Sequence, residues 1–131
     1  LVARSGEVVL SNGYGFARRD PPLSFTAETV FDIGSITKPF TAAAILKLEM
    51  EGKVGTSDPI TKYFTEVPED KRAITLHHLL THTAGLVDSL GGDYERIGRD
   101  EFVRLALASK LRSKPGAKYS YTNVGYSLLA A

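Results

Sequence analysis

The first third of the chain shows the alternation of apolar and polar positions that is typical of β-strands. Residues 1–17 follow this pattern on both sides of the turn-forming pair Ser5-Gly6, which predicts a β-hairpin. A loop is expected through Pro21-Pro22 because two adjacent prolines interrupt regular structure. The short β-branched and apolar run at residues 28–34 then predicts one further strand.

A change to helical spacing follows directly. The run TAAAILKLEM at residues 41–50 is rich in helix formers and has apolar residues at helical spacing, so a helix is expected to begin near Ser35. Serine is a favoured N-cap, and Pro39 is tolerated in a first turn but not deeper. Gly52 supplies the expected stop.

The sequence of the second half predicts short helices joined by loops. Each of three helices is predicted to start after a capping side chain: Asp58 before residues 59–64, Thr75 before residues 76–81 and Asp100 before residues 101–111. The stretch 87–99, with Gly91-Gly92, is expected to be a loop, and residues 125–131 start another helix. Five aromatic side chains are assigned to the core because of their apolar surroundings: Phe31, Phe40, Tyr63, Phe64 and Phe102.

The amino-acid composition argues against several classes of function. The chain has 131 residues and a formal net charge of +1 with acidic and basic residues interleaved, so charge gives no reason to expect a nucleic-acid partner or a membrane surface. The absence of cysteine excludes disulfides, thiolate metal sites and thiol catalysis. Apolar runs are too short to predict a membrane-spanning helix.

Two short motifs carry candidate chemistry. Ser35 and Lys38 are three residues apart at the start of the predicted helix, so their side chains share one face. A serine hydroxyl attacks an ester or amide only if a neighbouring group accepts its proton, and Lys38 or the phenol of Tyr121 can do so. The helix dipole at this end favours the oxyanion formed during attack. The alternative is that Ser35 only caps the helix and Lys38 is a solvated charge.

The histidines suggest a metal site as an alternative, but their sequence pattern gives little support for it. His78 and His82 are four residues apart and can face one metal from a helical turn, with His77 beside them. Leu79 follows His78 where the H-E-x-x-H motif requires glutamate, and no third ligand is suggested. We therefore predict no metal and no cofactor, and a structural role for His82 at the turn before Gly85.

The motifs occur within four longer blocks, in this order: residues 13–17 (GYGFA), 29–38 (TVFDIGSITK), 74–86 (ITLHHLLTHTAGL) and 115–126 with Pro115-Gly116 and Tyr119 to Tyr126. On these blocks the chain resembles the serine β-lactamase and penicillin-binding-protein superfamily. The resemblance is strongest to its class C β-lactamase-like branch, which includes D-alanyl-D-alanine carboxypeptidases and S-x-x-K esterases.

The resemblance implies roles for individual residues. Ser35 would be the acylated nucleophile, Lys38 would accept or relay its proton, Tyr121 would be the second acid/base group, and Asn123 would hydrogen-bond the substrate. A lysine is a poor base at neutral pH. Lys38 must therefore have its pKa lowered by its surroundings, or act as a fixed charge that lowers the pKa of Tyr121.

The resemblance also implies a mixed α+β fold of the β-lactamase/transpeptidase type, present in part: an N-terminal β-hairpin, the nucleophile helix and part of the helical subdomain, without C-terminal strands. Residues 1–57 would belong to the sheet subdomain with the nucleophile helix, and residues 58–131 to the helical subdomain. The family's third motif, K-T-G or H-x-G, does not occur in the sequence. Both ends look cut, so we interpret the chain as an internal piece that is inactive when isolated.

Two hypotheses of function remain. In the first, the parent protein is a serine hydrolase that forms an acyl-enzyme on β-lactams, D-amino-acid peptides or esters. In the second, it is a non-catalytic penicillin-binding-like homologue or a binding domain. The complete pairs Ser35/Lys38 and Tyr121/Asn123 favour the first. The expected partner is a small-molecule or peptide substrate, and the family resemblance favours a periplasmic or secreted location, with a cytoplasmic one open for an esterase.

Overall fold

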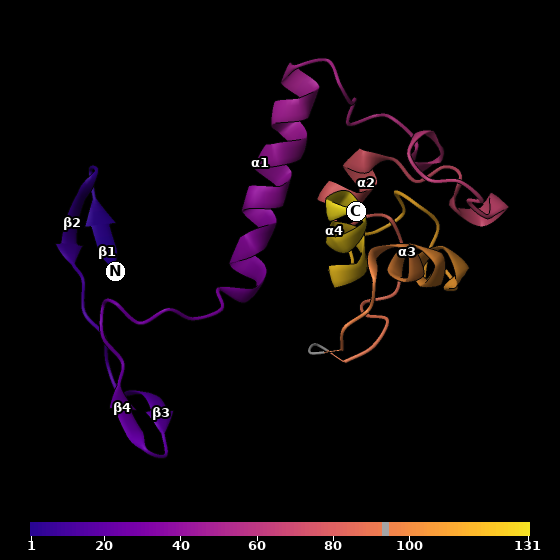
Figure 1. Ribbon diagram of the computed structural model, residues 1–131. Helices are drawn as coiled ribbons and strands as arrows, with labels where there is room; N and C mark the ends of the chain where they lie inside the picture. Colours follow the sequence, from indigo (N-terminus) through magenta and orange to yellow (C-terminus); the bar gives the residue numbers. More distant parts are fainter. Residues whose placement is uncertain (93–94) are drawn as a thin grey trace. The chain divides into compact units, whose positions relative to one another are not determined.

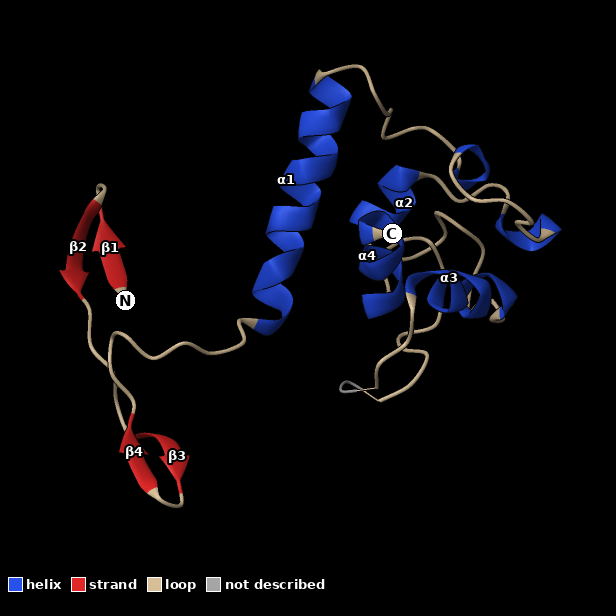
Figure 2. Ribbon diagram, in the orientation of Figure 1, coloured by secondary structure: helices blue, strands red, loops and turns tan. Residues whose placement is uncertain are grey.

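A computed structural model describes residues 1–92 and 95–131 (Figure 1). The chain divides into two compact units, residues 1–34 and residues 35–131. Strands occur in the first unit and α-helices in the second (Figure 2). The mixture of strands and helices agrees with the predicted α+β class, whereas the proposed subdomain division at residues 57/58 stays a prediction.

The first unit contains two antiparallel hairpins rather than the single hairpin expected at residues 1–17. Strand β1 (Val2–Arg4) pairs with β2 (Glu7–Leu10), and β3 (Phe16–Arg19) pairs with β4 (Pro22–Ser24). The Pro21-Pro22 segment is therefore not simply a loop. Pro22 starts a strand that has one neighbour in its sheet, where a residue without an N–H is tolerated.

The strand predicted at residues 28–34 is absent from the described structure. Thr26 and Thr29 form a turn, in which the Thr26 N–H donates to Thr29 Oγ1 at 2.9 Å. Further along, the Gly34 N–H donates to Asp32 Oδ1 at 2.6 Å. A β-branched run becomes a strand only where another strand supplies its hydrogen bonds, and local side-chain bonds take that place here.

A single 3₁₀ turn, Gly34–Ile36, spans the boundary between the two units and leads into helix α1 (Thr37–Met50). Ser35 lies in this turn and is not the N-cap, which is Ile36 without a side-chain hydrogen bond. The helix ends where the sequence indicated, with Gly52 in a left-handed conformation of φ +68°.

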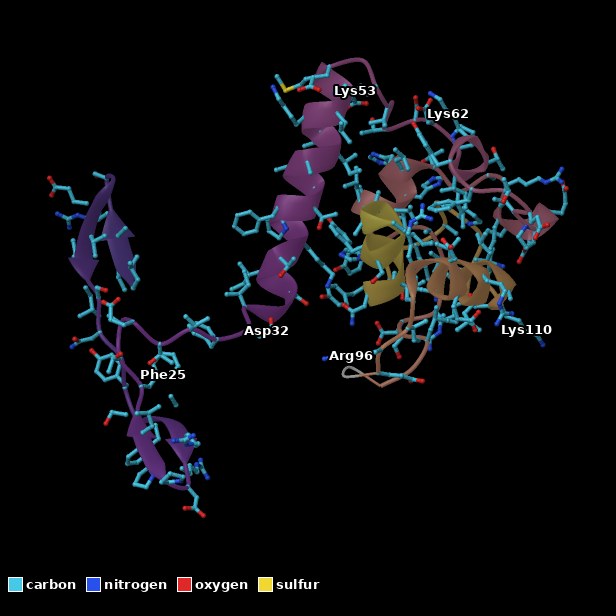
Figure 3. The ribbon with its side chains drawn as sticks, in the orientation of Figure 1. Phe25, Asp32, Lys53, Lys62, Arg96 and Lys110 are labelled. Atoms are coloured by element: carbon cyan, nitrogen blue, oxygen red, sulfur yellow. The ribbon has the colours of Figure 1, made fainter. Side chains whose placement is uncertain are left out.

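Three further helices surround the core of the second unit: α2 (Leu76–Leu80), α3 (Arg99–Ala108) and α4 (Asn123–Ala130). Helix α4, yellow in Figure 1, contacts α1, α2 and α3. The core is formed by buried aliphatic side chains from these helices and their connections: Ile45, Ile60, Val67, Ile74, Leu76, Leu79, Ala84, Leu86, Ala106, Leu107, Val124 and Leu128. Side chains crowd this region, and the labelled cations Lys62 and Lys110 lie at its periphery (Figure 3).

Some helix starts differ from the predicted caps. Thr75 caps α2 as expected, because its side chain accepts the His78 N–H. Helix α3 begins at Arg99 after Gly98, two residues before the expected start at residue 101. The segment after Asp58 is only a 3₁₀ turn, Ile60–Lys62, and its N-cap is Pro59.

The Asp58 carboxylate serves a different purpose from capping. It accepts hydrogen bonds from Lys62 Nζ at 2.7 Å, from Tyr63 Oη and from the Gly55 N–H at 2.7 Å. These bonds, with the one from Lys62 the largest, lower the pKa of Asp58 to about 2. The carboxylate therefore ties residues on both sides of it into one turn.

The aromatic side chains assigned to the core divide into two groups. Phe64 and Phe102 pack against the aliphatic core as predicted. Phe31 and Phe40 are 62% and 67% exposed, and Tyr63 is 37% exposed, so the core assignment is wrong for these three in this structure. Phe40 lies on α1, where other apolar side chains, including Leu46, are exposed as well.

Candidate active site

The 3₁₀ turn and first turn of α1 place Ser35 beside Lys38. Lys38 Nζ donates to Ser35 Oγ at 3.1 Å. Ser35 Oγ also lies 2.6 Å from Tyr121 Oη, a hydrogen bond in which either oxygen can be the donor. The Ser35 side chain is exposed and makes no capping bond, so its hydroxyl is accessible to a ligand and already paired with two proton-carrying groups.

Asn123 joins the same cluster from the first residue of α4. Its Oδ1 accepts from Lys38 Nζ at 2.7 Å. Lys38 therefore bridges Ser35 and Asn123, and all four side chains predicted from the sequence motifs lie together, with Tyr121 closing the cluster. The two halves come from segments about 85 residues apart in the chain.

The cluster is electrostatically polarised around the Lys38 ammonium. Lys38 Nζ lies 4.8 Å from the centroid of the Tyr121 ring and 5.7 Å from that of Tyr126. The interaction with Lys38, and after it the hydrogen bond with Ser35, lowers the pKa of the Tyr121 phenol below its usual value. A lowered pKa favours the phenolate, and a phenolate next to a serine hydroxyl can take up the serine proton.

A backbone ladder holds Tyr121 in position, although its segment has no regular secondary structure. The residues after α2 run beside the residues before α4. Three N–H to carbonyl bonds, each 2.8 Å long, connect them: Arg112 to Gly85, Gly116 to Thr83 and Ser120 to His82.

Gly85 permits the close approach of these two segments. Its φ of +75° is in the left-handed region, and a Cβ at this position would overlap the carbonyl of Ser113. The sequence block around Gly85 was expected to end a helix, and in the structure it also forms one side of the ladder that carries Tyr121.

Thr122 anchors the next residue of the Tyr121 segment. Its side chain is buried, with 1% of the residue exposed, and Oγ1 donates to the Val87 carbonyl at 2.6 Å. The following N–H, of Asn123, donates to the Asp88 carbonyl at 3.1 Å. These bonds connect the Tyr121 segment to the beginning of the 87–99 stretch. The position of Tyr121 therefore depends on Thr122, which supplies no reactive group.

Thr122→Val is expected to lower the free energy of unfolding by about 1–3 kcal/mol, because valine keeps the shape but leaves the partly buried Val87 carbonyl without its donor. Denaturant unfolding of the intact protein that carries this chain measures the change. Thr61→Val, at an exposed threonine of the Ile60–Lys62 turn, is the matched control and should change the free energy by less than about 0.5 kcal/mol. Equal effects of the two variants would contradict the anchoring role.

The histidines considered as metal ligands are engaged in other contacts. His78 Nδ1 accepts the Thr75 N–H at 3.2 Å in the capping box of α2. His82 Nδ1 accepts the Thr122 N–H at 3.3 Å. Across residues 1–92 and 95–131, no group of three or more His, Cys, Asp or Glu side chains is placed to hold a metal ion.

His82 is a neighbour of the site whose contact with Tyr121 was not predicted from the sequence. We expected it to stabilise a turn, and its backbone does adopt φ +56° after α2. Its ring, however, lies against Tyr121, with centroids 4.6 Å apart. The only indication in the sequence is that His82 belongs to the block at residues 74–86. Nothing in the sequence indicates that this block contacts Tyr121.

Comparison with known proteins identifies the family. The Beta-lactamase family model matches residues 1–131. Esterase EstB of Burkholderia gladioli is 30% identical over 142 residues, an alignment that covers 93% of this chain and 36% of the esterase. The chain belongs to the β-lactamase family, whose members among its relatives include penicillin-binding proteins, esterases and D-amino acid amidases.

Solved structures show the same relationship in three dimensions. The octameric penicillin-binding protein homologue from Pyrococcus abyssi matches with a TM-score of 0.81 and 36% identity, over 96% of this chain and 32% of that one. The D-amino acid amidase from Ochrobactrum anthropi matches with a TM-score of 0.74 and 28% identity, over 88% of this chain and 33% of that one. The fold is thus part of the β-lactamase/transpeptidase fold, and the chain spans about a third of the length of these relatives.

One further observation concerns membranes. Among the helices that the structure describes, none is both long enough and apolar enough to cross a lipid bilayer.

Proposed function

We propose that the protein carrying this chain is a serine hydrolase that forms an acyl-enzyme at Ser35. The observation that carries the proposal is the position of Ser35 Oγ, 2.6 Å from Tyr121 Oη and 3.1 Å from Lys38 Nζ. A nucleophile within hydrogen-bond reach of a proton acceptor, which is itself tuned by a third group, is the arrangement that covalent catalysis requires.

The proposed reaction has two stages. Ser35 Oγ bonds to the carbonyl carbon of the substrate while its proton passes to the Tyr121 oxygen, which the Lys38 charge stabilises as phenolate. Cleavage of the C–N or C–O bond returns that proton to the leaving group. Water then attacks the Ser35 ester by the same proton route and releases the acid.

Asn123 is proposed to bind the substrate beside this nucleophile. Its Oδ1 is held by Lys38 at 2.7 Å, which fixes the orientation of the amide group at the start of α4. A fixed amide can hydrogen-bond the acyl or amide portion of a substrate and orient its carbonyl toward Ser35.

The substrate class is proposed from the relatives as well as the site. β-lactams, D-amino-acid peptides or amides, and simple esters all contain a carbonyl that a serine can attack. The relatives include an esterase and a D-amino acid amidase. The alternative of a non-catalytic binding protein is less well supported, because all four chemical groups are present and in contact.

A matched panel of probes tests the proposal. Nitrocefin, a p-nitrophenyl ester, and paired D- and L-amino-acid amides are incubated with the intact protein, and the acylated peptide is located by mass spectrometry. We expect at least one acyl adduct on the peptide that contains Ser35. An adduct on a different serine, or turnover of every substrate without a covalent intermediate, would contradict the proposed route.

The isolated 131-residue chain is expected to show no turnover of nitrocefin or the p-nitrophenyl ester. No K-T-G or H-x-G triplet occurs in its sequence, and the family resemblance assigns an oxyanion-hole amide to that motif. Absorbance assays on the purified chain check this expectation. Measurable hydrolysis that disappears in Ser35→Ala would show that the oxyanion donors lie within these residues.

A further inference from the structure

His82 contacts the candidate site without belonging to its chemistry, and it does so through the backbone on both sides of Tyr121. The His82 carbonyl accepts the Ser120 N–H at 2.8 Å. The His82 ring accepts the Thr122 N–H at Nδ1, at 3.3 Å. One residue therefore holds both neighbours of Tyr121.

The His82 ring also lies among three tyrosines. Its centroid is 4.6 Å from that of Tyr121, with the planes inclined by 32°, and 5.0 Å from that of Tyr126. Tyr119 meets it edge-on at 5.8 Å. Tyr126 is itself fixed, because its hydroxyl donates to the Leu80 carbonyl at 3.0 Å. The imidazole thus connects α2 and α4 to the face of the Tyr121 ring.

The contact at Nδ1 requires a neutral imidazole. A ring nitrogen that accepts a hydrogen bond carries no proton, so His82 is assigned the tautomer with its proton on Nε2. A protonated His82 would present an N–H toward the Thr122 N–H, and the two donors would repel each other.

The charged and titratable groups that face His82 come from several elements: Lys38 on α1, Tyr119 and Tyr121 in the segment before α4, and Tyr126 on α4. Asp88 acts on the same cluster through Tyr121: Lys38 and Ser35 lower the pKa of Tyr121, and the negative charge of Asp88 opposes this in small part. Burial, and after it the positive charge of Lys38, holds the pKa of His82 below its usual value. The surroundings therefore favour the neutral form that the geometry requires.

We propose that His82 is a positioning residue for acylation: its neutral imidazole holds Tyr121 against Ser35, and its protonation releases Tyr121. This inference rests on the proposed function. Because the pKa of His82 is lowered in the folded protein, its contribution is complete above the unfolded value of about 6.5 and is lost as the pH falls.

His82→Asn separates titration from position. Asparagine tolerates the left-handed backbone at φ +56°, and its Oδ1 can accept the Thr122 N–H in place of Nδ1, but it does not titrate. We measure the rate of acylation by the probe that labels wild type, in intact protein, from pH 8 to pH 4.5. The rate of His82→Asn relative to wild type should rise as the pH falls through the folded-state midpoint of His82, which lies below 6.5, by up to about tenfold per pH unit once His82 is protonated.

His77→Asn is the matched control, because His77 is exposed on α2, the helix that precedes His82, and the chemical change is identical. Its rate relative to wild type should be independent of pH. A pH-independent ratio for His82→Asn would overturn the proposal. Absence of any adduct in wild type at all pH values would instead contradict the proposed function.

A second measurement does not depend on the variant being folded or active. In wild-type protein, the NMR titration of the His82 ring should show a midpoint below 6.5, and the ring signals of Tyr121 should shift with the same midpoint. Tyr121 signals that remain constant through the His82 titration would overturn the proposal, since a released phenol must change its environment.

Discussion

Replacing Ser35 with alanine is expected to abolish covalent labelling of the intact protein by the acylating probe and to lower turnover by a factor on the order of 10⁴ to 10⁶. The physical reason is direct. Ser35 Oγ is the atom placed between the proton acceptor at 2.6 Å and the ammonium at 3.1 Å, and alanine removes it without disturbing the turn that precedes α1. Intact-mass spectrometry measures labelling, and steady-state kinetics measure turnover.

Ser57→Ala provides the matched control for this variant. Ser57 is exposed and lies outside the cluster, so the same atom is removed where no chemistry is expected. Labelling and turnover should match wild type. Undiminished labelling of Ser35→Ala would remove Ser35 from its proposed role, and a loss of labelling in both variants would point to a general effect of handling the protein.

Tyr121→Phe is expected to lower the acylation rate by about 10²- to 10⁴-fold, the usual contribution of a positioned acid/base group. Phenylalanine keeps the ring that stacks on His82 and faces Lys38, and it removes only the hydroxyl that contacts Ser35. The variant therefore tests proton transfer rather than packing. Stopped-flow measurement of acylation gives the rate.

Tyr119→Phe makes the same change two residues earlier in the sequence. The Tyr119 ring meets His82 edge-on and is 67% exposed, and acylation should be within a factor of about two of wild type. A normal acylation rate in Tyr121→Phe would exclude the phenol as the proton acceptor.

Lys38→Met separates the two candidate bases. In our proposal the Lys38 charge lowers the pKa of Tyr121, so its removal should raise that pKa toward the ordinary value. The absorbance of the phenolate during a pH titration measures the change. An unchanged Tyr121 titration together with a complete loss of acylation would favour Lys38 itself as the base.

The site was more predictable than the fold around it. Ser35 and Lys38 are three residues apart, and a helical turn is enough to bring their side chains together. The motif with Tyr121 and Asn123 was identified from its residue types, and the structure places both in contact with the first pair. Their assignment as catalytic and substrate-binding residues stays a prediction until the variants are measured.

Errors in the predicted fold arose where local pattern and available partners disagree. Residues 28–34 have strand-like composition but no strand to pair with in the described structure, so turns and side-chain bonds form instead. Ser35 was expected to cap α1, but its hydroxyl is engaged by Lys38 and Tyr121 rather than by the backbone. In both cases the local sequence does not show which groups form hydrogen bonds with these residues in the folded chain.

The amino-acid sequence by itself determined the family, the helical spacing of Ser35 and Lys38, and the identity of the groups that can transfer a proton. These properties depend on residue type and on contacts within one turn of chain. Only the tertiary structure decided how Tyr121 reaches Ser35, because the backbone ladder through His82 and the anchor at Thr122 join segments that are about 35 to 40 residues apart. Such contacts depend on the packing of α2 against α4, which no local pattern specifies.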